Sequence, residues 1–216
     1  MKYPDIVRGE FLQRPNRFIA EVMVNGEPAR AHVRNTGRCT HVLSPGCEVS
    51  LQKSSDPGRA TKFTLIAVNT AQYGWVNLDS LAPNKLAGEW LAENGFTGIK
   101  PEFPFGDSRI DFYAEKKGER WLIEVKGCTL AENGTGLFPD APTKRGAKHL
   151  RELAKAAETG YRTAIAFVIM LRGVEEVRAN AAVDREFSEE FSRATANGVS
   201  VFCIPCECTA DTVQLR

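Results

Sequence analysis

The sequence predicts a mixed α+β chain of two parts, an all-β domain over residues 1–82 and an α/β domain over residues 83–216. In the first part, short strand-like segments are separated by turns rich in Gly, Pro and Asn. In the second, apolar residues at helical spacing alternate with strand-like runs. A chain of 216 residues is long enough for two small domains, each with its own core.

The first part contains several short strands with regular turn punctuation. Asn25-Gly26 is the clearest turn signal, and Gly-containing turns recur over residues 35–37, 44–46 and 56–58. This pattern is typical of a small barrel or sandwich, and at this size a five-stranded OB-type barrel is the leading candidate. The expected strands cover residues 18–24, 48–52, 63–69 and 73–78.

The second part alternates helices with strands. Leu86, Trp90 and Leu91 recur at helical spacing before Gly95, which predicts a helix over residues 84–94. The expected order α-β-β-β-α-β-α-β describes a mixed sheet flanked by helices. The other expected elements are strands over residues 99–105, 108–114, 120–126, 162–171 and 199–204, and helices over residues 143–158 and 184–197.

Composition and charge exclude several classes of protein. The formal net charge is only +1, so any nucleic-acid surface must come from local charge. No secretory signal and no membrane-spanning run is visible, so we expect a cytoplasmic protein that does not enter membranes, with its six cysteines reduced. Cys203, Cys206 and Cys208 form a single cluster. A zinc site takes about four ligands, usually in two pairs, so buried thiols are the better interpretation.

Turn geometry predicts three carboxylates on neighbouring strands. If residues 106–107 are central in a two-residue turn, Glu102 lies opposite Asp111. If residues 117–118 are central in the next turn, Asp111 lies opposite Glu124. Directly opposed residues have Cβ atoms about 4.5–5.5 Å apart, so the three acidic groups would share one face of the sheet.

Lys126 shares that face, because side chains two residues apart in a strand point the same way. Adjacent carboxylates destabilise a sheet unless a cation compensates them, and we expect Glu102, Asp111 and Glu124 to bind Mg²⁺, with Mn²⁺ able to substitute. A lysine beside them orients the attacking water or stabilises charge on a phosphate. The predicted catalytic residues for phosphodiester hydrolysis are therefore Asp111, Glu124 and Lys126. The alternative is a solvated sheet face on which Glu and Lys are merely neighbours.

A basic stripe marks the helix expected after these strands. Lys144, Lys148, Arg151 and Lys155 recur at helical spacing. Arg145 and the helix N-terminus add donors suited to a phosphate. Beside an acidic metal site this face fits a phosphodiester substrate, and the predicted nucleic-acid contacts are Lys144, Arg145, Lys148 and Arg151. The alternative is an ordinary solvated helix surface.

Three further expectations concern the surroundings of this helix and the first domain. His149 is either a proton shuttle or, as is commoner for a helical histidine near a core, structural. The loop over residues 127–142 contains Asn133-Gly134 and is expected to be mobile. In the first domain, Arg17 and Arg38 are predicted nucleic-acid contacts on an OB-type barrel, which tracks a backbone with basic residues and stacks bases on aromatic ones.

At this point the sequence resembles the sugar fermentation stimulation protein A family. The resemblance extends over nearly the whole chain, with its motifs in order. The matching stretches are RPNRF (14–18), HVRNTGR (32–38), LSPG (43–46), SRIDF (108–112), EVK (124–126), FPDA (138–141) and TKRGAKHLREL (143–153).

The resemblance implies an N-terminal OB-like β-barrel and a C-terminal α/β PD-(D/E)xK restriction-endonuclease-like domain. The nuclease motif falls on Asp111, Glu124 and Lys126, and Ile110 stands where the motif's name has Pro. The resemblance also implies DNA binding and a regulatory role in sugar metabolism, notably that of maltose.

Three functions compete on this reading. The first is a DNA-binding protein with a regulatory role, and the resemblance supports it most directly. The second is an active Mg²⁺-dependent nuclease acting on DNA or RNA, favoured by the complete set Asp111, Glu124 and Lys126. The third is an interaction module whose acidic face binds no metal. Whether the chain is an enzyme is left open by the residues alone.

Overall fold

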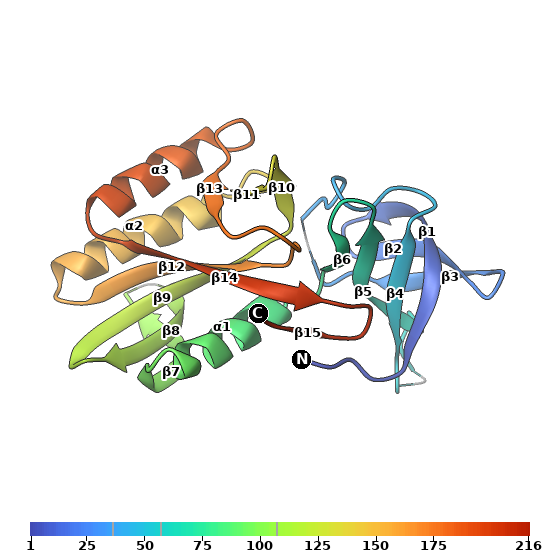
Figure 1. Ribbon diagram of the computed structural model, residues 1–216, viewed down its shortest axis with the longest axis horizontal. Helices are drawn as coiled ribbons and strands as arrows, with labels where there is room; N and C mark the ends of the chain where they lie inside the picture. The colour runs from blue at the N-terminus through green and yellow to red at the C-terminus, as the bar shows by residue number, and fades with distance from the viewer. Residues whose placement is uncertain (36, 57, 107) are drawn as a thin grey trace.

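The computed structural model describes residues 1–35, 37–56, 58–106 and 108–216. Figure 1 shows a barrel built from the first part of the chain beside a layered α/β domain built from the second. The turns expected over residues 35–37, 56–58 and 106–107 include Thr36, Pro57 and Asp107, which lie outside the described residues.

The N-terminal unit is a closed five-stranded OB-type barrel. Its strands run in the order β3-β2-β1-β4-β5, and a parallel pairing of β3 with β5 closes the circle, while β6 pairs with β5. Fully buried Val22, Leu51 and Leu65 lie in its core. The bounds are β1 Ile6–Asn16, β2 Ile19–Val24, β3 Glu27–His32, β4 Glu48–Lys53, β5 Phe63–Thr70 and β6 Gly74–Asn77.

Strands β1 and β3 do not stand out in the sequence. In β1 only Phe11 is fully buried, and register shifts on either side of Gln13 break the alternation with β2. In β3 only Ala31 is buried, and the strand contains Pro28. Both strands lack the apolar alternation by which a half-buried strand is recognised.

The C-terminal unit is a six-stranded mixed sheet between helices. The strand order is β15-β14-β12-β9-β8-β7, with β12 parallel to both β9 and β14. Helix α1 covers one face, and α2 and α3 cover the other (Figure 1). The bounds are α1 Ala82–Glu93, β7 Thr97–Phe105, β8 Ser108–Lys116, β9 Glu119–Cys128, α2 Lys144–Glu158, β12 Arg162–Ile169, α3 Arg185–Ala196, β14 Ser200–Cys208 and β15 Val213–Leu215.

The segment expected as a loop over residues 127–142 instead contains strands of a small sheet, so its assignment as a loop is wrong. Strands β10 Leu130–Glu132 and β11 Thr135–Phe138 form a hairpin, and β13 Val177–Ala179 pairs in parallel with β11. Asn133 and Gly134 both have positive φ, the geometry of a two-residue hairpin turn. Asn133-Gly134 is therefore the turn of the β10–β11 hairpin.

The two units contact each other through several polar groups. The Tyr73 hydroxyl donates to the carbonyl of Ala131 at 3.3 Å, and His41 Nε2 lies 3.0 Å from the carbonyl of Thr129. At the N-terminus, the Tyr3 amide donates to Asp211 at 2.8 Å, so the first residues lie against the end of the second unit. The predicted division between residues 82 and 83 stays a prediction.

The cysteines are all free thiols. Burial raises the pKa of the Cys206 thiol to about 12, which makes it a poor nucleophile. In the part of the chain that the structure describes, no helix is long and apolar enough to cross a lipid bilayer.

Asp184 joins the N-termini of α2 and α3. Its Oδ1 accepts from the Phe187 amide at 2.9 Å, which caps α3, and its Oδ2 accepts from the Thr143 amide at 2.7 Å, directly before α2. We expect Asp184→Ala to lower the free energy of unfolding by about 2 kcal/mol, because a cap and a charged hydrogen bond are lost together. Urea titration measures this, and Asp184→Asn, which keeps the Oδ1 cap, should lose less. A loss under about 0.5 kcal/mol for the alanine variant would contradict the double role.

Candidate metal and nucleic-acid site

The predicted hairpin register brings Asp111 and Glu124 together. Strands β8 and β9 pair with Phe112 opposite Ile123, in the register expected from the turn at residues 117–118. Asp111 stands one residue further along, and its Oδ2 accepts from the Val125 amide at 2.7 Å. The structure therefore confirms the pairing of these two strands.

Glu124 is buried within this pair, with only 2% of its surface exposed. Its Oε1 contacts both the Lys126 ammonium and Nδ1 of His149 on α2. Lys126 thus shares a face with Glu124, as strand alternation predicts. Oε2 is different: it is buried and, in the described part of the chain, has no hydrogen-bond partner.

His149 orients Glu124 through a defined tautomer. Nε of Arg145 donates to His149 Nε2 at 3.2 Å, and an arginine nitrogen only donates. Nε2 is therefore the unprotonated nitrogen, and Nδ1 carries the hydrogen that it donates to Glu124. The imidazole acts as a structural support for the carboxylate, which favours the structural interpretation of this residue over a proton shuttle.

The two carboxylates respond oppositely to their surroundings. Burial, and after it the charge of Glu124, raises the pKa of Asp111 above its usual value, only partly offset by Lys126 and by two hydrogen bonds. Burial alone would raise the pKa of Glu124, but the hydrogen bond from His149 and the charge of Lys126 outweigh it and hold that pKa below its usual value. The ionised form of Glu124 is therefore favoured, whereas ionisation of Asp111 keeps a cost that its neighbours only partly offset.

These features fit a divalent cation. The free Oε2 of Glu124 is a buried acceptor beside an Asp111 carboxylate whose ionisation a positive charge would favour. Mg²⁺ takes one or two carboxylates and keeps several waters, so a two-carboxylate site is sufficient. Among the described residues, no three His, Cys, Asp or Glu side chains form a ready metal cage. Asp111 and Glu124 are the residues that would hold the cation.

Glu102 does not join this group in the structure. The neighbouring pairs Phe103–Ile110 and Pro101–Phe112 place it opposite Asp111, as predicted. However, residue 102 has a φ of 53°, which breaks the regular alternation of side chains. Its side chain is 62% exposed, and its carboxylate lies 3.7 Å from the Arg109 guanidinium instead.

Asn84 is a site residue that sequence reasoning missed. Its side-chain amide, at the start of α1, donates to Asp111 Oδ1 at 2.9 Å. No sequence spacing links residue 84 to residue 111, because the contact arises from packing of α1 against the sheet. Pro83 touches that sheet too, 2.9 Å from where a side chain at Gly127 would begin.

The basic residues predicted to contact nucleic acid are differently placed. On α2, Lys144 and Arg145 are exposed, whereas Arg151 lies 3.1 Å from Glu186 and 3.3 Å from Glu190 on α3. The ammonium of Lys148 lies 3.4 Å from Glu152. The charges of Lys148 and Arg151 are therefore partly neutralised. Lys144 and Arg145, at the start of α2, remain exposed cations without a carboxylate partner among the described residues.

Arg17 and Arg38 are exposed on the barrel. Both lie in the loops held by Arg14, whose guanidinium donates to their carbonyl oxygens at 2.6 Å for Arg17 and 2.9 Å for Arg38. Arg14 itself is thus occupied with backbone groups and is not free to bind a ligand.

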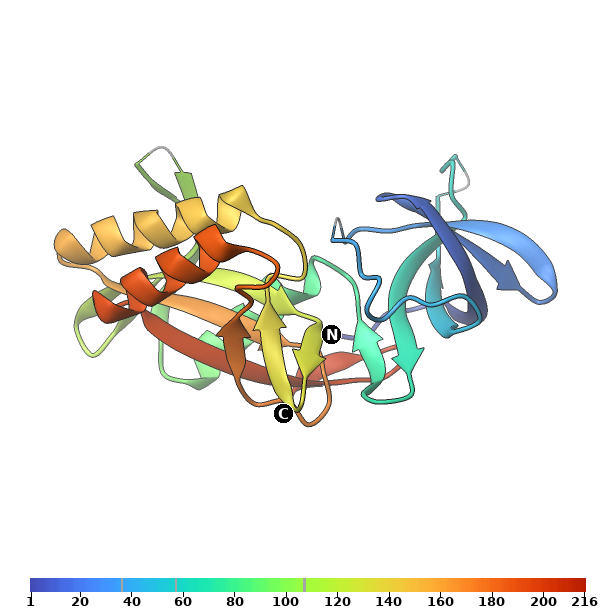
Figure 2. The ribbon, with the colours of Figure 1, turned by 90° about the horizontal axis from the view of Figure 1, so that it is seen from above.

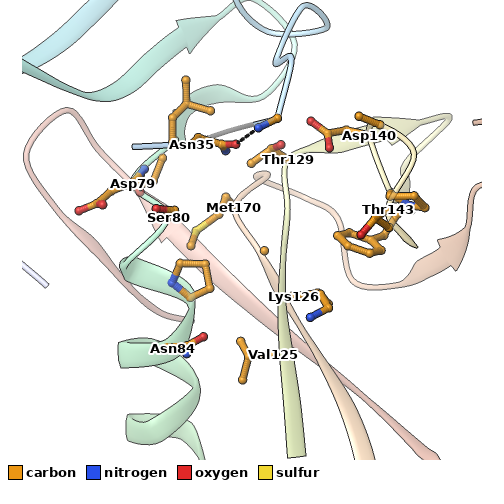
Figure 3. A pocket seen from close by; sticks show the side chains of 18 of the residues that line it. Asn35, Asp79, Ser80, Asn84, Val125, Lys126, Thr129, Asp140, Thr143 and Met170 are labelled. Carbon is orange, nitrogen blue, oxygen red and sulfur yellow. Dashed lines mark hydrogen bonds between the residues drawn. The ribbon is translucent and has the colours of Figure 1, made fainter. Parts of the chain in front are cut away.

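A pocket of about 370 Å³ lies between the two units and reaches Asn84 and Lys126, the residues that contact Asp111 and Glu124. Figure 3 shows Asn84 of α1 facing Val125 and Lys126 of β9 across its lower part, with Asp140 and Thr143 on another wall. Asn35 and Gly37 from the barrel form the upper rim. Lys126 is therefore accessible from this pocket, with 16% of its side chain exposed.

The support that His149 gives to Glu124 predicts an effect on metal affinity. In His149→Leu, Oε1 loses a hydrogen-bond donor, and we expect the affinity for Mn²⁺ to fall about 10- to 100-fold, as is usual when a partner of a ligating group is removed. His149→Asn places an amide donor near the position of Nδ1 and should retain most of the affinity. Calorimetric titration measures both, and equal affinities for the leucine variant and the unmodified protein would contradict this role.

Comparison with known proteins agrees with this architecture. The family model described as "Sugar fermentation stimulation protein RE domain" matches residues 81–212, and "SfsA N-terminal OB domain" matches residues 12–78. A "Sugar fermentation stimulation protein homolog" of Clostridium beijerinckii is 42% identical over 220 residues, which cover 100% of this chain and 97% of that protein. The homolog of Ruminiclostridium cellulolyticum is 44% identical over 210 residues, 95% of this chain and 92% of that protein.

A solved structure of similar fold is described as Pyrococcus furiosus SfsA in complex with Ca²⁺. It superimposes with a TM-score of 0.87 at 26% identity and covers 100% of this chain and 95% of that one.

Proposed function

This chain belongs to the sugar fermentation stimulation protein family, and we propose that it is a metal-dependent nuclease that hydrolyses phosphodiester bonds in DNA or RNA. The observation that carries the proposal is the buried, unpartnered Oε2 of Glu124 beside Asp111, with the Lys126 ammonium next to both. Two carboxylates beside a lysine that lines a pocket are the groups that such hydrolysis needs.

Each residue has a definable task. Asp111 and Glu124 supply the carboxylate oxygens for Mg²⁺ or Mn²⁺, and Asn84 and His149 hold those carboxylates in position. A bound divalent cation supplies charge neutralisation at the phosphate and activation of water. Lys126 presents an ammonium that stabilises negative charge developing on the phosphate. The relative from Pyrococcus furiosus, solved with Ca²⁺, supports a divalent cation, since Ca²⁺ and Mg²⁺ share oxygen ligands.

The proposal is tested by cleavage of labelled single-stranded, duplex and flapped DNA and of matching RNA. Reactions contain Mg²⁺, Mn²⁺ or EDTA. We expect cleavage of at least one substrate with either metal and none with EDTA. Cleavage that persists in EDTA, or no cleavage of any substrate with either metal, would contradict the proposal.

A second function, DNA binding without cleavage, is favoured by a separate observation. Exposed cations lie on both units, Arg17 and Arg38 on the barrel and Lys144 on α2. They suit a phosphate backbone whether or not a bond is broken. In that case the protein is a cytoplasmic DNA-binding regulator of sugar metabolism, including that of maltose. Salt-sensitive DNA binding in the absence of any cleavage is its expected signature.

A further inference from the structure

The tip of the hairpin between β1 and β2 carries an exposed aromatic ring. Phe18 is 45% exposed, and the guanidinium carbon of Arg17 lies 4.8 Å from the centre of its ring. Of the large apolar residues exposed in the described part of the chain, Phe18 is the only aromatic one; the others are Leu81 and Val201. The side-chain oxygen of Asn16 accepts from the amides of Phe18 and Ile19, so the tip has a fixed shape.

This tip is attached to the rim of the pocket between the two units. Besides the carbonyls of Arg17 and Arg38, the Arg14 guanidinium holds those of Asn35 and Gly37, both at 2.6 Å. Asn35 and Gly37 line the pocket that reaches Lys126. The partly buried Arg14 guanidinium therefore fixes the Arg17–Phe18 pair, Arg38 and the pocket rim relative to one another. Figure 2 shows the loop after β3 lying between the barrel and the C-terminal unit.

We propose that Arg17, Phe18 and Arg38 form a platform that binds single-stranded nucleic acid and leads it to the pocket between the units. An exposed phenylalanine stacks on the face of an unpaired base, and an arginine plane does the same while its charge meets the phosphates. A duplex keeps its base faces inside the stack and offers the ring no such partner. The size of the pocket, about 370 Å³, suits a group of nucleotide size rather than a duplex.

The part of the pocket wall formed by Asp140 favours a base over a phosphate. A carboxylate repels phosphate but accepts hydrogen bonds from base amino groups. The phosphates next to that base would then follow Arg17 and Arg38 on the barrel, and the scissile phosphate would lie at the Lys126 end of the pocket. The inference rests on the proposed nucleic-acid substrate but not on its cleavage, so it is tested without metal.

The experiment measures binding of the full chain to fluorescein-labelled oligothymidylate by anisotropy in EDTA, with a duplex of equal length in parallel. Phe18→Ala should weaken single-strand binding about 5- to 150-fold, the effect of losing one stacked base, with an unchanged salt dependence. Arg17→Gln and Arg38→Gln should each lower the slope of log affinity against log salt by about 0.7, the value for one phosphate of a single strand. Val201→Ala and Arg178→Gln, exposed residues of the C-terminal unit, serve as matched controls and should bind normally.

Phe18→Trp gives a second readout that does not depend on loss of binding. Its fluorescence should be quenched when oligothymidylate is added, because the base stacks on the indole. Unchanged affinity in Phe18→Ala, absence of quenching in Phe18→Trp, or duplex binding as tight as single-strand binding would each overturn the inference. Cleavage measured separately with metal shows whether the catalytic proposal stands or falls on its own.

Discussion

Asp111→Asn is expected to lower the rate of metal-dependent cleavage about 1,000-fold or more. A cation held at such a site lowers the activation barrier by several kcal/mol, and each 1.4 kcal/mol changes the rate by about a factor of ten. The amide keeps the size of the side chain and an oxygen to accept from the Val125 amide. Single-turnover cleavage at saturating Mg²⁺ measures the loss. Glu102→Gln is the matched control: the Glu102 side chain is 62% exposed and its carboxylate lies near Arg109, so cleavage should stay normal. Loss of cleavage in that control would instead restore Glu102 as a metal ligand.

The same substitution should stabilise the protein when no metal is present. Burial and Glu124 raise the pKa of Asp111 above its ordinary 3.8, so protonated Asp111 favours the folded state at low pH. That contribution is lost as the pH rises through the folded-state pKa, and at pH 7 the carboxylate opposes folding. In EDTA at pH 7, Asp111→Asn should therefore melt at a higher temperature than the unmodified protein, with a smaller difference near pH 3.

Adding Mg²⁺ should reverse the order of the two melting temperatures. Mg²⁺ binds the folded state and should raise the melting temperature of the unmodified protein, by about 2.7 kcal/mol in stability at 100 times its dissociation constant. Asp111→Asn should show almost no such rise. Calorimetric scans with EDTA and with Mg²⁺ measure both effects. If Asp111→Asn is less stable than the unmodified protein in EDTA at pH 7, the ionised Asp111 carboxylate does not destabilise the folded state, and this prediction is contradicted.

Lys126→Met is expected to lower kcat about 100- to 1,000-fold, the usual effect of removing one donor that stabilises developing charge. Methionine keeps the length and the apolar stem of lysine but removes the ammonium that contacts Glu124. Binding of Mn²⁺ should persist, because the carboxylates of Asp111 and Glu124 remain. Lys155→Met, on the exposed face of α2, is the control for a change in surface charge and should cleave normally. Equal kcat for Lys126→Met and the unmodified protein would exclude an electrostatic role for this lysine.

The core of the site could be predicted from the sequence because local turns fix it. Lys117 and Gly118 both have positive φ, as a two-residue hairpin turn requires, and this sets the register that places Asp111 beside Glu124. Strand alternation then puts Lys126 on the same face as Glu124. These steps depend only on residues close in sequence, so they needed no knowledge of the packing.

The parts that depended on packing were missed or misplaced. Asn84 reaches Asp111 from α1, a contact between segments 27 residues apart. The spacing of charges within α2 predicted that Arg151 is free to bind a phosphate, but Glu186 and Glu190 of α3 form ion pairs with it. For Glu102 the register was right, yet a positive φ at that residue broke the alternation on which the prediction relied. The periodicity of a helix or strand in the sequence predicts none of these three features.

The most direct test of the account is to locate Mn²⁺ in crystals of the protein by its anomalous scattering. We expect one strong peak in contact with a carboxylate oxygen of Asp111 and with Oε2 of Glu124, the buried oxygen that has no partner among the described residues. The peak should be absent from Asp111→Asn crystals grown with the same metal. Full occupancy of Mn²⁺ elsewhere with none at this pair, or an unchanged peak in Asp111→Asn, would contradict the assignment of this site as the metal centre of a nuclease.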